Sequence, residues 1–140
     1  MTFDLQRFVS AQAPMMAAVE AELRAGQKRS HWMWFVFPQL RGLGQSPTAR
    51  HYGLDGRAEA EAFLAHPVLG PRLHECTALV NAVRDRNVHA IFGSPDDLKF
   101  RSCTTLFDAI EPGTVFDAAL HHFFGGQRDP RTLELLSSEA

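Results

Sequence analysis

Lysine is scarce in this chain of 140 residues. Of its 14 cationic residues only Lys28 and Lys99 are lysines, and the rest are arginines. The formal net charge is −2, so the chain lacks the basic excess that is typical of proteins that bind double-stranded nucleic acid. A local patch of Lys28, Arg29, Arg41 and Arg50 could still contact a single strand through charge and stacking. On balance we do not expect a nucleic acid as the partner.

Long apolar runs and a leader segment are missing too. No window approaches the roughly 20 apolar residues that a membrane helix needs. The first residues, MTFDLQRF, show neither the basic nor the apolar part of a secretory signal. Without such a signal, Cys76 and Cys103 are expected to be reduced, buried thiols. These features predict a cytoplasmic protein that does not contact a membrane.

Strand patterns are nearly absent. Only residues 32–37 and 88–92 could form short extended runs, and neither alternates apolar with polar residues. The chain length is close to that of one ordinary domain. We therefore expect an all-α fold, with at most one minor strand pair, in a single domain over residues 1–140.

Helix start signals recur along the chain. A capping residue followed by proline occurs at Ser46-Pro47, Ser94-Pro95 and Asp129-Pro130. These and similar signals predict a first helix capped by Asp4 and a second helix that ends near Gly26. Two short helices are predicted over Thr48 to Tyr52 and Arg57 to Leu64, followed by a long helix that begins at Pro71. Further helices are predicted to begin at residues 94–97, to run from the capping residue Thr114 through Phe124, and to span Arg131 to Leu136.

Both tryptophans lie in one aromatic segment, KRSHWMWFVF, at residues 28–37. Large aromatic side chains of this kind often form a hydrophobic core. Residues next to one another on a strand, or two apart on a helix, cannot all face one core. The alternative is therefore that some of these aromatic side chains line a ligand-binding pocket. In that case His31, Trp32 and Trp34 would contact an adenine-like or flavin-like ring, with help from a nearby cation.

The segment that follows, PQLRGLGQSP, contains two glycines and ends at a predicted helix start. Free backbone N–H groups there, with Arg41 and Arg50 nearby, could hold a phosphate. A tight turn between two helices is the alternative. Lys99, standing alone in an arginine-rich chain, is either a point charge inside the same pocket or an ordinary surface lysine.

Several segments of the chain occur in a recognisable order. They are KRSHWMWF and PQLRGLG at residues 28–44, DLKFRSC with TLF at residues 97–107, and FFGG at residues 123–126 with Asp129 and Thr132-Leu133. Together they resemble a bacterial family known only as domain-of-unknown-function family 1810. The resemblance covers nearly the whole chain in the family's order and implies a compact, mostly helical domain, but no established activity.

Two short segments, Thr48-Ala49-Arg50-His51-Tyr52 and Leu98-Lys99-Phe100, carry a more distant resemblance. They are similar to a Thr-Ser-Glu-His-Tyr helix and a later Ala-Lys-Phe helix of the NADAR superfamily, which acts on ADP-ribose derivatives and related nucleotides. Thr48, His51, Tyr52, Lys99 and Phe100 match these motifs, whereas Arg50 stands at the family's glutamate position. The resemblance implies a binder or an N-glycosidase-like hydrolase of ADP-ribose or a related phosphorylated nucleotide.

Arg50 at the glutamate position reverses a charge. An arginine cannot stabilise a cationic sugar as a carboxylate does, but it can pair with a phosphate. If bonds are cleaved, Asp55 is our first substitute for the missing carboxylate, with His51 or Tyr52 orienting the sugar. The resulting hypothesis places Asp55 and His51 in catalysis and assigns ligand contacts to His31, Trp32, Trp34, Arg41, Arg50, Tyr52 and Lys99.

The hypothesis includes no metal and no cofactor, and its partner is a phosphorylated, nucleotide-like small molecule. A non-catalytic helical module that binds another protein remains the alternative. A monomer and a dimer are equally compatible with the sequence.

Overall fold

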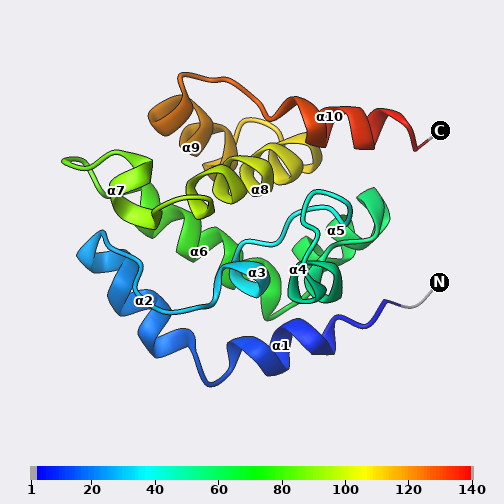
Figure 1. Ribbon diagram of the computed structural model, residues 1–140, viewed down its shortest axis with the longest axis horizontal. Helices are drawn as coiled ribbons and strands as arrows, with labels where there is room; N and C mark the ends of the chain where they lie inside the picture. Colours follow the sequence, from blue (N-terminus) through cyan, green and yellow to red (C-terminus); the bar gives the residue numbers. More distant parts are fainter. Residues whose placement is uncertain (1–2, 140) are drawn as a thin grey trace.

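The computed structural model describes residues 3–139, and in this part of the chain the fold is all-α, as predicted (Figure 1). An isolated parallel bridge between Leu40 and Leu54 is the extended pairing found there. The helices are α1 (Gln6–Gln12), α2 (Met16–Ala25), α3 (Met33–Val36), α4 (Pro47–Tyr52), α5 (Gly56–Ala65), α6 (Leu69–Asn81), α7 (Val88–Phe92), α8 (Asp96–Ile110), α9 (Val115–Phe124) and α10 (Pro130–Ser137).

Helix α8 lies at the centre of the fold (Figure 1). It packs against α5, α7, α9 and α10, while α6 packs against α2, α5 and α9. Phe100 and Phe107 of α8 are fully buried. Phe100 meets Phe37 edge to face, with the ring centroids 5.1 Å apart, and Phe107 lies 5.7 Å from Phe63 of α5. These aromatic contacts join the short α3 segment to the helices around α8, because burying such large rings stabilises the fold.

The two runs that the sequence allowed to be extended are both helical. Residues 33–36 form α3, in which Met33, Phe35 and Val36 are all buried. A short helix surrounded by core can bury side chains in several directions, so it needs no period-2 pattern. Residues 88–92 form α7, which begins where the Asn87 side chain accepts a hydrogen bond from the Ala90 N–H at 2.8 Å.

The predicted helix starts are confirmed at Ser46 and Asp129 and wrong at Asp4 and Pro71. Ser46 accepts a hydrogen bond from Ala49 N–H at 3.1 Å, and Asp129 accepts one from Thr132 N–H at 3.3 Å. Asp4 does not cap α1, whose capping position is held by Leu5 without a side-chain bond. Pro71 lies inside the first turn of α6 rather than opening it, since that helix begins at Leu69.

Both cysteines are free and buried, as the sequence predicted. Burial raises the pKa of Cys76 to about 12 and that of Cys103 well above its ordinary value. Both side chains are therefore neutral thiols at physiological pH. None of the helices within residues 3–139 is long and apolar enough to cross a bilayer.

Candidate functional site

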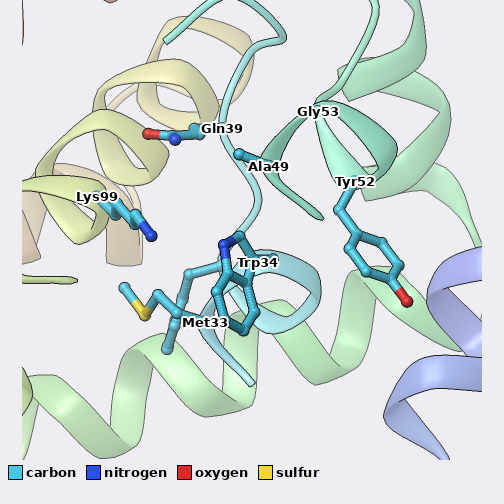
Figure 2. Close-up of a pocket in the computed structure, with 8 residues that line it drawn as sticks. Met33, Trp34, Gln39, Ala49, Tyr52, Gly53 and Lys99 are labelled. Atoms are coloured by element: carbon cyan, nitrogen blue, oxygen red, sulfur yellow. The ribbon is translucent and has the colours of Figure 1, made fainter. Parts of the chain in front are cut away.

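A narrow cleft lies between α3, α4 and α8 (Figure 2). We call it the Trp34 cleft; the space inside it that the centre of a water molecule is able to occupy is about 10 Å³. This is room for about one water molecule, whereas ordinary ligand pockets enclose roughly 300–1,000 Å³, so a larger ligand requires the cleft to widen. Its lining residues are Met33, Trp34, Phe37, Gln39, Ala49, Tyr52, Gly53 and Lys99.

Lys99 and Trp34 define the chemistry of this cleft. Lys99 extends from the first turns of α8 toward the indole, and its Nζ lies 5.1 Å from the Trp34 ring centroid (Figure 2). This is the range of a cation–π contact. Both side chains are only half-buried. The cleft therefore offers a planar aromatic face and a positive charge next to each other, both accessible from outside.

Two further side chains complete the walls. Gln39 lies on the same side of Trp34 as Lys99 (Figure 2), and its amide has no hydrogen-bond partner among the described residues. The Tyr52 ring lines the opposite side, but its hydroxyl points away from Lys99 (Figure 2). Tyr52 packs on Phe8 and Phe35, with centroids 5.8 Å and 5.4 Å away. Those contacts hold the Tyr52 ring in place, so it serves as a wall rather than as a proton donor.

Close packing of glycines shapes the cleft. A Cβ at Gly53 would lie 2.7 Å from the Arg41 Cα, and one at Gly44 would lie 2.5 Å from the Ala49 Cβ. Larger residues at these positions would separate the loop from α4. Gly53 thereby lets residues 40 and 54 form the bridge that brings Gln39 and Tyr52 to the same cleft.

Trp32 lies elsewhere, although it is two residues from Trp34. It is fully buried, and its indole Nε1 donates a hydrogen bond to Glu22 Oε1 at 3.0 Å. The same carboxylate accepts bonds from the Arg29 N–H at 2.7 Å, the Ser30 N–H at 2.9 Å and the Ser30 hydroxyl at 2.6 Å. Trp32 and Glu22 therefore fix the loop that leads into α3 rather than contacting a ligand in the cleft.

Burial by itself would raise the pKa of Glu22. The hydrogen bonds from the Ser30 hydroxyl, the backbone of Arg29 and Ser30, and the Trp32 indole outweigh it and lower the pKa from 4.5 to about 2. A carboxylate with a lowered pKa stabilises the fold above its ordinary pKa, and that stabilisation is lost as the pH falls from about 4.5 to about 2.

We therefore expect Glu22→Gln to lower the free energy of unfolding at pH 7 by about 1–2 kcal/mol, after allowance for solvent screening of this partly exposed group. The difference from the wild type should shrink below pH 4.5 and vanish near pH 2. Urea unfolding at a series of pH values measures it. A difference that stays constant with pH would show that the ionised carboxylate is not responsible.

Four of the predicted site residues line a different surface depression, which we call the Arg50 depression. Arg41, Arg50, His51 and Asp55 are all exposed there. The lining residues are Phe3, Asp4, Arg7, Arg41, Arg50, His51, Asp55 and Glu59. Ala49, Tyr52 and Gly53 follow the i, i+3, i+4 spacing and face the Trp34 cleft, so the residues between them face away from it.

Arg41, expected to hold a phosphate, is engaged with the end of α4. Its Nε donates to the Arg50 carbonyl at 3.1 Å and its Nη2 to the Gly53 carbonyl at 2.9 Å. Asp55, the expected substitute carboxylate, lies 3.8 Å from Arg41 Nη1. These bonds satisfy carbonyl groups that a helix end leaves free. Arg41 thus contributes to the position of α4.

The predicted residues therefore fall into three groups. Trp34, Tyr52 and Lys99 line the Trp34 cleft. Arg41, Arg50, His51 and Asp55 line the Arg50 depression. His31 is exposed and Trp32 is in the core, and neither lines either surface.

Five residues that line the cleft were not predicted from the sequence. They are Met33, Phe37, Gln39, Ala49 and Gly53. Gln39 lies in the PQLRGLG segment singled out above, so its polar amide beside an aromatic run was a usable signal. The apolar residues carried no such signal, because apolar side chains in clefts and in cores follow the same patterns.

The fold and the cleft together define an all-α protein with a small aromatic cleft that a lysine borders. The chain belongs to the family described as Protein of unknown function (DUF1810), whose model matches residues 2–136. The family resemblance stated from the motifs is thereby confirmed, and the comparison does not extend to the NADAR superfamily.

A solved structure is similar over nearly the whole chain. It is the crystal structure of the conserved hypothetical protein Rv1873 from Mycobacterium tuberculosis, with 57% sequence identity and a TM-score of 0.92. The match covers 96% of this chain and 97% of that one. No curated protein matches significantly.

Proposed function

We propose that the Trp34 cleft binds a phosphorylated, nucleotide-like small molecule. The observation that carries the proposal is the Lys99 ammonium 5.1 Å from the centroid of a half-exposed indole. A base or other flat ring stacks on Trp34, and the phosphate pairs with Lys99. Gln39 has a free amide that is able to hydrogen-bond the edge of such a ring.

The ammonium at present covers part of the aromatic face that a ring would use. A ligand of nucleotide size therefore requires Lys99 to move from the indole toward the phosphate, which also widens the small cleft. Lys99 is a flexible side chain, and a charge-assisted bond to phosphate replaces both its cation–π contact with Trp34 and its 3.6 Å contact with Asp96.

The distant similarity to the NADAR superfamily supports the same location. Of the five matching residues, Tyr52 and Lys99 come from different helices and line one cleft. Arg50, which replaces the family's glutamate, faces the Arg50 depression. The side chains lining the cleft include neither a carboxylate nor a histidine. We therefore propose that the cleft binds ADP-ribose or a related phosphorylated nucleotide. Hydrolysis of an N-glycosidic bond by Asp55 and His51 has less support, because both residues lie outside the cleft.

A helical module that binds another protein is favoured by one observation. Leu98 is 58% exposed and, with Leu43 and Pro95, forms the apolar part of a groove next to the cleft, whose polar lining includes Lys99, Asp129 and Arg131. Apolar patches rimmed by polar residues are common at contact surfaces between proteins. In this second function the aromatic cleft is part of the docking surface, and no nucleotide binds.

Titration calorimetry with ADP-ribose, AMP, nicotinamide mononucleotide and adenosine separates the two functions. We expect Trp34→Ala to weaken all of these ligands by about tenfold or more, because stacking on the ring is lost. Lys99→Met should weaken the phosphorylated ligands by about tenfold and leave adenosine nearly unchanged. These results would locate the base and the phosphate separately.

Arg50→Ala is the matched control, since it removes an exposed cation outside the cleft. Its binding should stay within about twofold of the wild type. If Arg50→Ala or Asp55→Asn abolishes binding while Trp34→Ala does not, the ligand lies in the Arg50 depression. If none of the four compounds binds the wild type, the nucleotide proposal is wrong and the docking function is favoured.

A further inference from the structure

The two lysines of the chain converge on a single carboxylate. Lys28 Nζ lies 2.9 Å from Asp96 Oδ2, and Lys99 Nζ lies 3.6 Å from Asp96 Oδ1. Lys28 lies in the loop before α3, whereas Asp96 and Lys99 lie in the first turn of α8. We call Lys28, Asp96 and Lys99 the lysine triad. With both ammonium groups charged, the triad carries one net positive charge.

The two ends of the triad differ in exposure. The Lys28 side chain is only 8% exposed, and its Nζ lies 5.2 Å from the ring centroid of the buried Trp32. The Lys99 side chain is 22% exposed and faces Trp34 at the open cleft. Asp96 lies between them and is 19% exposed. Lys28 is thus a fixed inner cation, and Lys99 is an outer cation that a ligand is able to reach.

We infer that Lys28 is a positioning residue that neutralises Asp96 and thereby releases Lys99 for an anionic ligand. The inference rests on the proposed function of the Trp34 cleft and adds a residue to it. If Lys99 leaves Asp96 to contact a phosphate, the carboxylate keeps its shorter ion pair with Lys28. Lys99 then offers the ligand a positive charge that the triad carboxylate no longer cancels.

Without Lys28, Lys99 would be the only ammonium beside Asp96 in the triad. Moving Lys99 to a phosphate would then leave a largely buried carboxylate unpaired, which is strongly unfavourable. The remaining pair would also carry no net charge to attract an anion.

The test uses titration calorimetry of the full chain with inorganic pyrophosphate, AMP and adenosine. Lys28→Met is expected to weaken pyrophosphate and AMP by about tenfold, because a nearby unit charge is lost. Adenosine should remain within about twofold. Lys28→Gln provides a second variant, and thermal unfolding verifies that each variant is folded.

The double variant Lys28→Met/Asp96→Asn distinguishes charge balance from a structural effect. It restores the net positive charge, with Lys99 as its source, so affinity for pyrophosphate and AMP should return to within about threefold of the wild type. If the double variant binds as weakly as Lys28→Met, the inference is overturned. It is equally overturned if Lys28→Met weakens adenosine and AMP alike, or weakens neither.

The same titrations separate the inference from the proposed function. If pyrophosphate follows the expected pattern while AMP and adenosine do not bind, the nucleotide proposal fails and the role of Lys28 stands. If AMP and adenosine bind but Lys28→Met changes neither, the nucleotide proposal stands and the role of Lys28 fails. Absence of binding by all three probes to the wild type contradicts both.

Discussion

Replacing Phe100 by alanine is expected to lower the free energy of unfolding by about 3–5 kcal/mol. Phe100 is fully buried at the centre of the fold. Its ring stacks on Phe92 of α7 with centroids 4.8 Å apart, meets Phe37 at 5.1 Å, and lies 6.2 Å from Phe123 of α9. Truncation leaves a cavity between three elements that no single neighbour is able to fill, so relaxation recovers little of the loss.

Urea denaturation measures this effect, and Leu98→Ala is its control on the same helix. Leu98 is 58% exposed, so its truncation should change the stability by no more than about 0.5 kcal/mol. Because Phe100 directly follows Lys99 in α8, Phe100→Ala should also weaken ligand binding at the Trp34 cleft. A loss below about 1 kcal/mol for Phe100→Ala would contradict the central position of this ring.

Replacing Glu59 by alanine is expected to destabilise the protein by about 3 kcal/mol or more. Glu59 is 2% exposed and pairs with Arg7 Nη1 at 2.9 Å. Its other oxygen accepts a hydrogen bond from the Asp55 N–H at 2.7 Å. Arg7 in turn donates to the carbonyls of His51 at 2.9 Å and Gly53 at 3.2 Å. Loss of the carboxylate leaves a guanidinium, with only 10% of its side chain exposed, without its counter-ion.

Two variants bracket the expected result for Glu59. Glu59→Gln keeps an acceptor for the Asp55 N–H but removes the charge, so it should be less destabilising than Glu59→Ala. Glu61→Ala removes an exposed carboxylate that pairs with Arg57 at 3.3 Å, and should cost no more than about 0.5 kcal/mol. Thermal and urea unfolding measure all three. If Glu59→Ala is no worse than Glu61→Ala, Glu59 does not hold α1 against α4 and α5.

The Arg7–Glu59 pair also bears on the Arg50 depression. Because Arg7 binds the carbonyl end of α4, the pair sets where Arg50, His51 and Asp55 lie. The loss of Glu59 is therefore expected to disturb this depression more than the Trp34 cleft, whose lysine comes from α8. The two surfaces share α4 but depend on different interactions.

Local signals in the sequence determined the helical character and several helix starts. Ser46 and Asp129 cap their helices through bonds to residues three positions along, so the sequence alone is sufficient to predict them. The absence of strand patterning predicted the all-α fold. Lys99, one of only two lysines, and Trp34, in an aromatic run, were also predicted from the sequence as ligand contacts, and both line the cleft.

Only the tertiary structure decided which tryptophan is accessible and which polar residues meet. Trp32 is buried because Glu22, on another helix, binds its indole, while nothing comparable engages Trp34 in the described part of the chain. Arg50 and Tyr52 face different surfaces, because Gly53 and Arg41 set the position of α4 against the cleft. The approach of Lys28 to Asp96 depends on packing of the whole fold, since an ion pair between distant segments leaves no periodic signal in the sequence.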